Sequence, residues 1–74
     1  MAMMRVSNGI ELKRGQLVYF KKTTPTVVLN SLGLKSPRQM ALTVQRDERA
    51  NGQAFVETPQ GVQGVDRNFL ILAR

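Results

Sequence analysis

Short runs of hydrophobic residues separated by turn-forming residues dominate this chain, and they predict strands. The clearest run, at residues 16–22, is β-branched and aromatic at its centre and ends in two lysines. Apolar and polar positions alternate at 10–13, and a short extended piece is expected at 26–29. Residues 53–58 and 69–73 predict two further strands, and the second is apolar on both faces, which is typical of a central strand.

Residues 36–52 fit two different patterns. A Ser-Pro pair at the start and an Asn-Gly pair near the end would frame a helix. A helical stripe would, however, continue through the acidic positions 47 and 48, so it ends after two turns. As a strand, the segment places Met40, Leu42 and Val44 on one face with a period of two. We therefore favour a strand, while a single helical turn at 37–39 would accommodate both patterns.

Turn signals between these runs define the organisation of the chain. Residues 47–52 are expected to form a hairpin loop that ends in Asn-Gly, and Pro-Gln-Gly at 59–61 a second turn. We expect a flexible tail at residues 1–9 and a single domain at 10–74. About five short strands predict an all-β fold, either a small five-stranded barrel or a strongly bent antiparallel sheet, with room for one short helical turn.

The last third of the chain carries a recognisable order of elements. A glycine-containing hairpin arm at 61–65 leads into a tight turn at 66–68 and then into an apolar strand at 69–71. This order resembles the end of an SH3-like β-barrel, and the resemblance implies that architecture. It does not extend to the binding of proline-rich peptides, because the chain has no tryptophan and its loop at 21–38 is basic without an aromatic residue.

The size and composition of the chain limit its chemistry. A domain of 74 residues buries roughly 60% of its unfolded surface, and we assign Phe20, Phe55 and Phe69 to its core. Without cysteine there are no disulfides, and without histidine as well we expect no metal site. The lack of cysteine favours a reducing compartment, so we expect a cytoplasmic protein. The longest apolar run, residues 69–73, is too short to cross a membrane.

The sequence offers no constellation of catalytic residues. Histidine and cysteine are absent, and the five carboxylates are dispersed. Asp47 and Glu48 are adjacent, but we interpret them as a solvated hairpin tip balanced by Arg46 and Arg49. The glycines match neither a dinucleotide-binding motif nor a P-loop, so no cofactor is expected. We therefore expect a protein that is not an enzyme.

Positive charge is concentrated in the first half of the chain. Residues 1–40 carry seven Lys and Arg against one acid, whereas residues 41–74 carry four of each sign. Because neighbouring loops of a small barrel lie close together, we expect these cations to form one face that binds nucleic acid through its phosphates. Tyr19 would offer a ring for a base to stack on, or would be half-buried with its hydroxyl at the rim. The candidate interface comprises Lys13, Arg14, Tyr19, Lys21, Lys22, Lys35 and Arg38.

Two other interpretations stay open. The same basic face would fit an acidic protein surface, with Leu32 and Leu34 of the loop at 30–37 as hydrophobic contacts for that partner. The protein would then be an interaction module or a small subunit, either a monomer or a small homo-oligomer. In the simpler interpretation the charges only keep a small domain soluble. We expect no binding to membranes, because no amphipathic helix is predicted.

Overall fold

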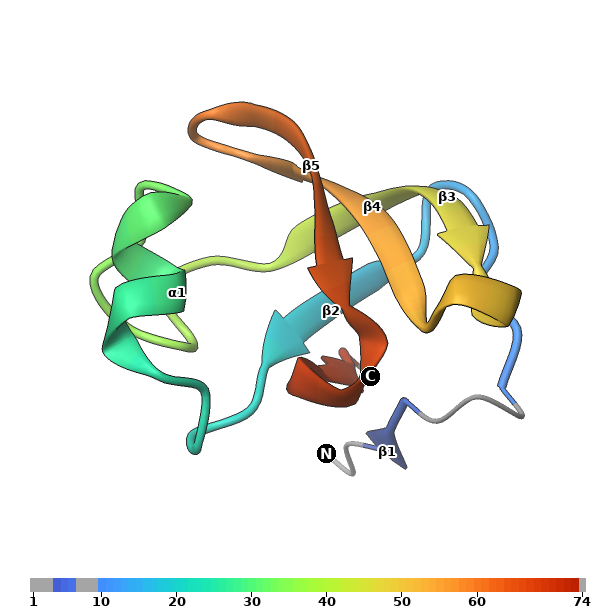
Figure 1. Cartoon of the computed structure of the whole chain (residues 1–74), viewed down its shortest axis with the longest axis horizontal. Helices are drawn as coiled ribbons and strands as arrows, with labels where there is room; N and C mark the ends of the chain where they lie inside the picture. The colour runs from blue at the N-terminus through green and yellow to red at the C-terminus, as the bar shows by residue number, and fades with distance from the viewer. Residues whose placement is uncertain (1–3, 7–9, 74) are drawn as a thin grey trace.

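The computed structural model describes residues 4–6 and 10–73. Within them, antiparallel strands form one sheet in the order β1-β6-β2-β3-β4-β5 (Figure 1). The strands are β1 (Met4–Arg5), β2 (Leu17–Phe20), β3 (Leu42–Glu48), β4 (Gln53–Thr58), β5 (Gly61–Asp66) and β6 (Leu70–Leu72). The all-β class is confirmed. The sheet is not closed, since β1 and β5 form two separate edges.

Strand β3 connects the two parts of this sheet. Its first residues, Leu42 and Thr43, pair with β2, and the remainder of the strand pairs with β4. The register shifts between Val44 and Arg46. A bulge of this kind bends a strand and increases its twist. Side chains from both parts consequently enter a single core.

Alternation along the strands decides which side chains form this core. In β2, Val18 and Phe20 are fully buried, whereas Leu17 is 45% exposed and Tyr19 is half-buried on the opposite face. The core comprises Val6, Leu12, Val18, Phe20, Leu29, Leu32, Leu34, Leu42, Val44, Ala54, Val56, Val65, Leu70 and Leu72, with Val28 and Phe69 packed against it.

Most of the predicted elements are confirmed. The strands expected at 16–22 and 53–58 are β2 and β4, and the ambiguous segment at 36–52 contains strand β3. Strand β6 lies between β1 and β2, as its two apolar faces predict. The turn expected at 66–68 is the 3₁₀ turn η2 (Arg67–Phe69), and a second 3₁₀ turn, η1 (Arg49–Asn51), lies between β3 and β4.

Residues 4–5 and 26–29 form elements that were not expected from the sequence. Of the tail expected at residues 1–9, the structure describes 4–6: Met4–Arg5 pairs with β6, and Val6 is fully buried. The extended piece predicted at 26–29 is wrong, because this segment forms the helix α1 (Thr26–Ser31). Helix α1 contributes Leu29 to the core. Burial of that side chain stabilises a helix that the local sequence does not favour.

Candidate functional site

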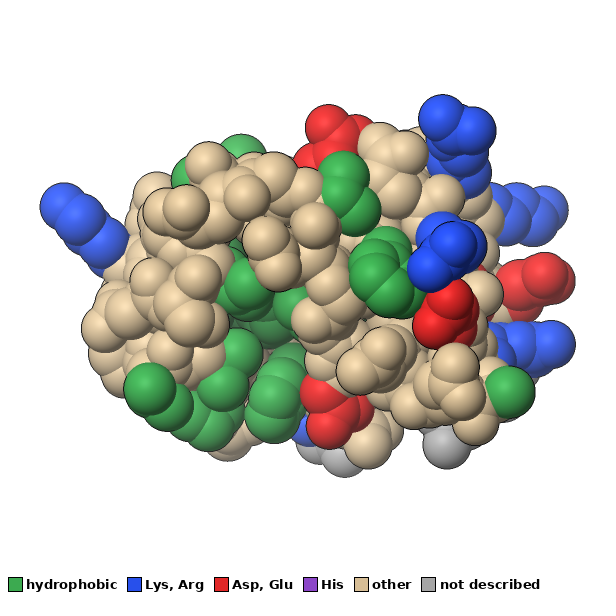
Figure 2. All heavy atoms as spheres, turned by 45° about the horizontal axis from the view of Figure 1, so that its top comes forward, with side chains coloured by type: hydrophobic (Ala, Val, Ile, Leu, Met, Phe, Trp, Pro, Cys, Tyr) green, Lys and Arg blue, Asp and Glu red, His purple; other side chains and the backbone are tan. Residues whose placement is uncertain are grey.

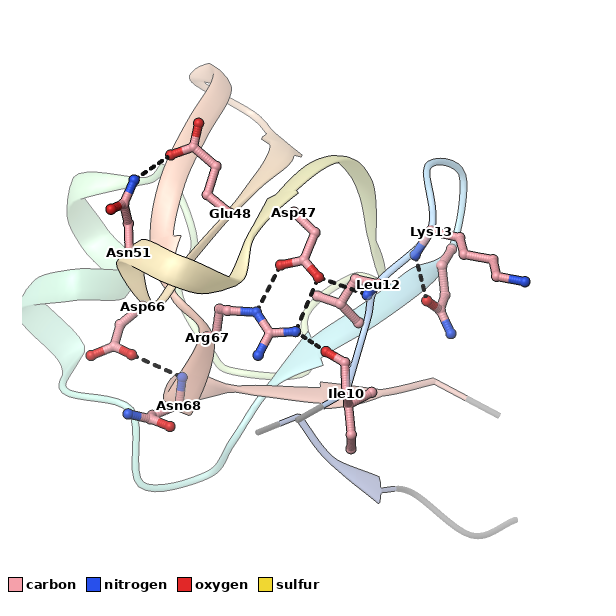
Figure 3. A network of polar contacts seen from close by, with 10 residues as sticks. Ile10, Leu12, Lys13, Asp47, Glu48, Asn51, Asp66, Arg67 and Asn68 are labelled. Carbon is pink, nitrogen blue, oxygen red and sulfur yellow. Dashed lines mark hydrogen bonds and ion pairs between the residues drawn. The ribbon is translucent and has the colours of Figure 1, made fainter. Parts of the chain in front are cut away.

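A buried ion pair joins three segments that are distant in the sequence (Figure 3). Arg67 of η2 is fully buried, and its Nε donates to Asp47 Oδ1 at 2.8 Å, while its Nη2 donates to Asp47 Oδ2 at 3.1 Å. The same Nη2 also donates to the carbonyl oxygen of Ile10, and Asp47 Oδ2 accepts the N–H of Leu12 at 2.8 Å. These paired hydrogen bonds compensate the cost of burying both charges.

The two adjacent acids of β3 therefore have different roles. The interpretation as a solvated hairpin tip is wrong for Asp47, whose side chain is 7% exposed. It holds for Glu48, whose carboxylate pairs with Arg46 at 2.8 Å and accepts a hydrogen bond from Asn51 at 3.3 Å.

The turn before β2 presents the first pair of candidate cations. The N–H of Gln16 donates to the carbonyl of Lys13 at 3.0 Å, and the Gln16 side chain accepts the N–H of Lys13 at 3.1 Å. Gly15 within this turn donates its N–H to Val44 of β3 at 2.8 Å. Lys13 and Arg14 are exposed at the tip of the turn. They lie next to the N-terminal end of β2.

A second group of candidates meets on the outer face of β2. The guanidinium carbon of Arg38 lies 6.0 Å from the centre of the Tyr19 ring, at the limit of a cation–π contact. Lys21 continues the ladder beyond the strand, because its N–H donates to the carbonyl of Phe69 at 2.7 Å. Alternation then places the Lys21 side chain on the face that carries Tyr19. The structure thus brings Tyr19 and Arg38 together, and the alternation along the chain assigns Lys21 to the same face.

The other candidates do not join this group at one patch. Lys13 and Arg14 are separated from Lys21 and Lys22 by residues 15–20, of which the four residues of β2 alone span about 13 Å. Lys35 is exposed in the segment before β3, where its N–H donates to the side chain of Gln39 at 2.7 Å. Figure 2 shows Lys and Arg side chains at both ends of the longest axis of the molecule. The seven residues form an elongated, divided surface.

The two leucines assigned to a partner contact lie in the interior. Leu32 is 7% exposed and Leu34 is 2% exposed, and both belong to the core of this chain. They pack inward from the segment that follows α1, so the interpretation as hydrophobic contacts for a partner is corrected.

The outer face of β3, β4 and β5 carries a feature that the sequence analysis missed. Phe55 was assigned to the core, but Ala54 and Val56 on either side of it are fully buried, so its half-buried ring lies on the outer face. The guanidinium carbon of Arg46 lies 4.5 Å from the centre of this ring. An open hollow of about 270 Å³ at this place is lined by Gln45, Arg46, Phe55 and Val62.

Comparison with protein-family models, curated proteins and solved structures finds no match. Among residues 4–6 and 10–73, no group of three or more acidic side chains could hold a metal ion. The same residues contain no helix with the length and hydrophobicity needed to span a membrane.

Proposed function

We propose that this protein is a non-catalytic module that binds nucleic acid along the outer face of β2. The observation that carries the proposal is the position of Tyr19, a half-buried ring with Arg38 beside it and Lys21 on the same sheet face. An aromatic ring flanked by cations is the arrangement that holds single-stranded nucleic acid, because bases stack on the ring and phosphates contact the cations.

The charges at the two ends of β2 support the same proposal. A single-stranded nucleic acid that lies along β2 would contact Lys13 and Arg14 at one end of the β-strand and Lys21 and Lys22 at the other. Each of these four residues lacks a nearby carboxylate within 4.0 Å among the described residues. Cations free of acidic partners are available to replace the counterions of a phosphate backbone. The division of the basic residues into two groups therefore suits an elongated ligand.

An acidic protein surface is the weaker candidate partner. The residues that favoured it over nucleic acid in the sequence, Leu32 and Leu34, are buried. Binding to an acidic protein would require the basic residues but not the ring of Tyr19. Substitution of Tyr19 therefore distinguishes the two candidate partners in an experiment.

The test is the binding of a fluorescently labelled single-stranded oligonucleotide, measured by anisotropy over a range of salt concentrations. We expect Arg38→Ala and Lys21→Ala each to weaken binding several-fold and to reduce the slope of log affinity against log salt by about 0.7. Tyr19→Leu is expected to cost about 1–3 kcal/mol, the usual value for one stacked base. Arg49→Ala is the matched control, because it removes an exposed arginine from the part of the chain with no net charge.

Two outcomes would contradict the proposal. If Arg49→Ala weakens binding as much as Arg38→Ala, the attraction is diffuse and β2 carries no site. If the charge variants weaken binding while Tyr19→Leu has no effect, no base stacks on the ring and an acidic protein becomes the better candidate.

We also infer that the chain has an SH3-like arrangement of strands. The support is the order β2, β3, β4, β5, η2 and β6, in which a one-turn 3₁₀ step follows the β4–β5 hairpin and the last strand pairs with β2. The fold by itself does not imply a function. A cytoplasmic location, which the lack of cysteine favours, belongs to the same proposal.

A further inference from the structure

Strand β5 forms a long edge of the sheet that is open to solvent. Within residues 4–6 and 10–73, it pairs only with β4, through all six of its residues from Gly61 to Asp66. Only Val65 among these six residues is buried. In an antiparallel pair, about half of the N–H and C=O groups of an edge strand point away from its neighbour.

The usual protections of an edge strand are missing from β5. Natural edges are kept from pairing by lysine, proline, bulges or very short length. Strand β5 contains neither lysine, arginine nor proline, and its register with β4 is continuous. Its one charged residue, Asp66, lies at the end of the strand, where its carboxylate accepts the N–H of Asn68 at 2.8 Å. Among the described residues, the opposite edge, β1, comprises two residues.

We propose that β5 pairs with β5 of a second copy of this chain and extends the antiparallel sheet across a two-fold axis. A ring of head-to-tail copies would need two different edges of comparable length, whereas in the part of the chain that the structure describes β1 offers two residues and β5 six. An edge that pairs with itself gives a closed dimer.

The charge distribution permits this approach in spite of the net charge of +6. The excess lies entirely in residues 1–40, while residues 41–74, which contain β3, β4 and β5, carry four arginines and four acids. Two copies that meet at β5 therefore bring together their neutral parts. Val62, 52% exposed on the outer face beside the hollow at Phe55, would be covered near the two-fold axis.

The experiment measures the molar mass of the intact chain by light scattering coupled to gel filtration, from micromolar to millimolar concentration. We expect the wild type to shift from monomer to dimer, and Val62→Lys to raise the dissociation constant of the dimer at least tenfold. Val27→Lys is the matched control, because Val27 is 73% exposed on α1, and it should dimerise like the wild type. Circular dichroism verifies that both variants are folded.

Hydrogen exchange of the backbone amides locates the interface. The amides of β5 should exchange more slowly as the concentration of the wild type rises. A wild type that stays monomeric at millimolar concentration would overturn the proposal and leave the edge for a strand of another protein. A dimer that is unaffected by Val62→Lys, or that gives β5 amides no added protection, would overturn it as well. None of these measurements depends on the binding of nucleic acid.

Discussion

Arg67 shows how a single side chain can organise a domain of this size. Its guanidinium is fully buried yet bonded to Asp47 and to the carbonyl of Ile10. Removing one partner of a buried pair leaves the other charge without compensation, which typically costs about 3–5 kcal/mol. A core in a chain this small provides only about 3–5 kcal/mol of net stability. Loss of one partner alone would therefore cost about as much free energy as the whole fold has in net stability.

We predict that Asp47→Ala is strongly destabilised at 25 °C, because it removes the carboxylate that accepts two hydrogen bonds from the buried guanidinium of Arg67. The double variant Asp47→Leu/Arg67→Met should recover part of the stability, since it removes both charges and keeps apolar volume. Urea denaturation followed by circular dichroism measures both. An Asp47→Ala variant as stable as the wild type would show that the pair contributes little.

The sequence did not identify this role because a bulge reverses the alternation of β3. Counting by twos from the buried Leu42 and Val44 would place position 46 inward and position 47 outward. The register shift between Val44 and Arg46 has the opposite effect, so that Asp47 pairs with the buried Ala54 and Arg46 with Phe55 on the outer face. No local signal in the segment marks this bulge.

At the scale of elements, α1 is the part of the fold that propensity could not predict. Its first residues, Thr26-Val27-Val28, are β-branched and favour strands. The helix is stabilised by the burial of Leu29 and by the turn at Gly33, two residues after its last residue, Ser31. This glycine has φ +83° and donates its N–H to the carbonyl of Asn30 at 3.1 Å. A proline before the segment and a glycine after it were the signals available in the sequence.

We predict that Gly33→Ala destabilises the protein by more than about 2 kcal/mol. An alanine at this position would have to keep the left-handed backbone conformation, which costs about 1–2 kcal/mol. Its Cβ would also lie 3.1 Å from Cβ of Pro59. Gly15→Ala is the control, because Gly15 has a similar φ of +89° with no atom within 4 Å of the added methyl. Urea denaturation should show a larger loss for Gly33→Ala, and equal losses would mean that the contact with Pro59 relaxes freely.

At the scale of the whole molecule, the strands were predictable and their assembly was not. Runs such as 53–58 are bounded by nearby turn residues, so strands of this kind could be identified from their own sequence. Whether the basic residues of the first half of the chain lie close together depends on how the strands are arranged in the sheet. Residues 13–14 precede β2 and residues 21–22 follow it, and a strand holds its two flanking segments at opposite ends. Arg38 reaches the Tyr19 ring on the outer face of β2 from the segment before β3, which is distant in the sequence.

The hydrogen bonds around Arg67 also bear on the order of events in folding. They join Arg67 to Ile10 across 57 positions and to Asp47 across 20, and Leu12 to Asp47 across 35. The β4–β5 hairpin, in contrast, pairs residues that are close in sequence. Closing long loops costs entropy before any contact offsets it, so we expect the hairpins in the rate-limiting transition state and the N-terminal segment to join later. Asp47→Asn should accordingly accelerate unfolding far more than it slows refolding in stopped-flow measurements. Equal effects on the unfolding and refolding rates would show that the contacts of Arg67 already form in the transition state of folding. If the N-terminal segment joins last in folding, unfolding begins where residues 10–12 separate from Arg67 and Asp47. The lifetime of the native state then depends on the hydrogen bonds of Ile10 and Leu12 to these two residues.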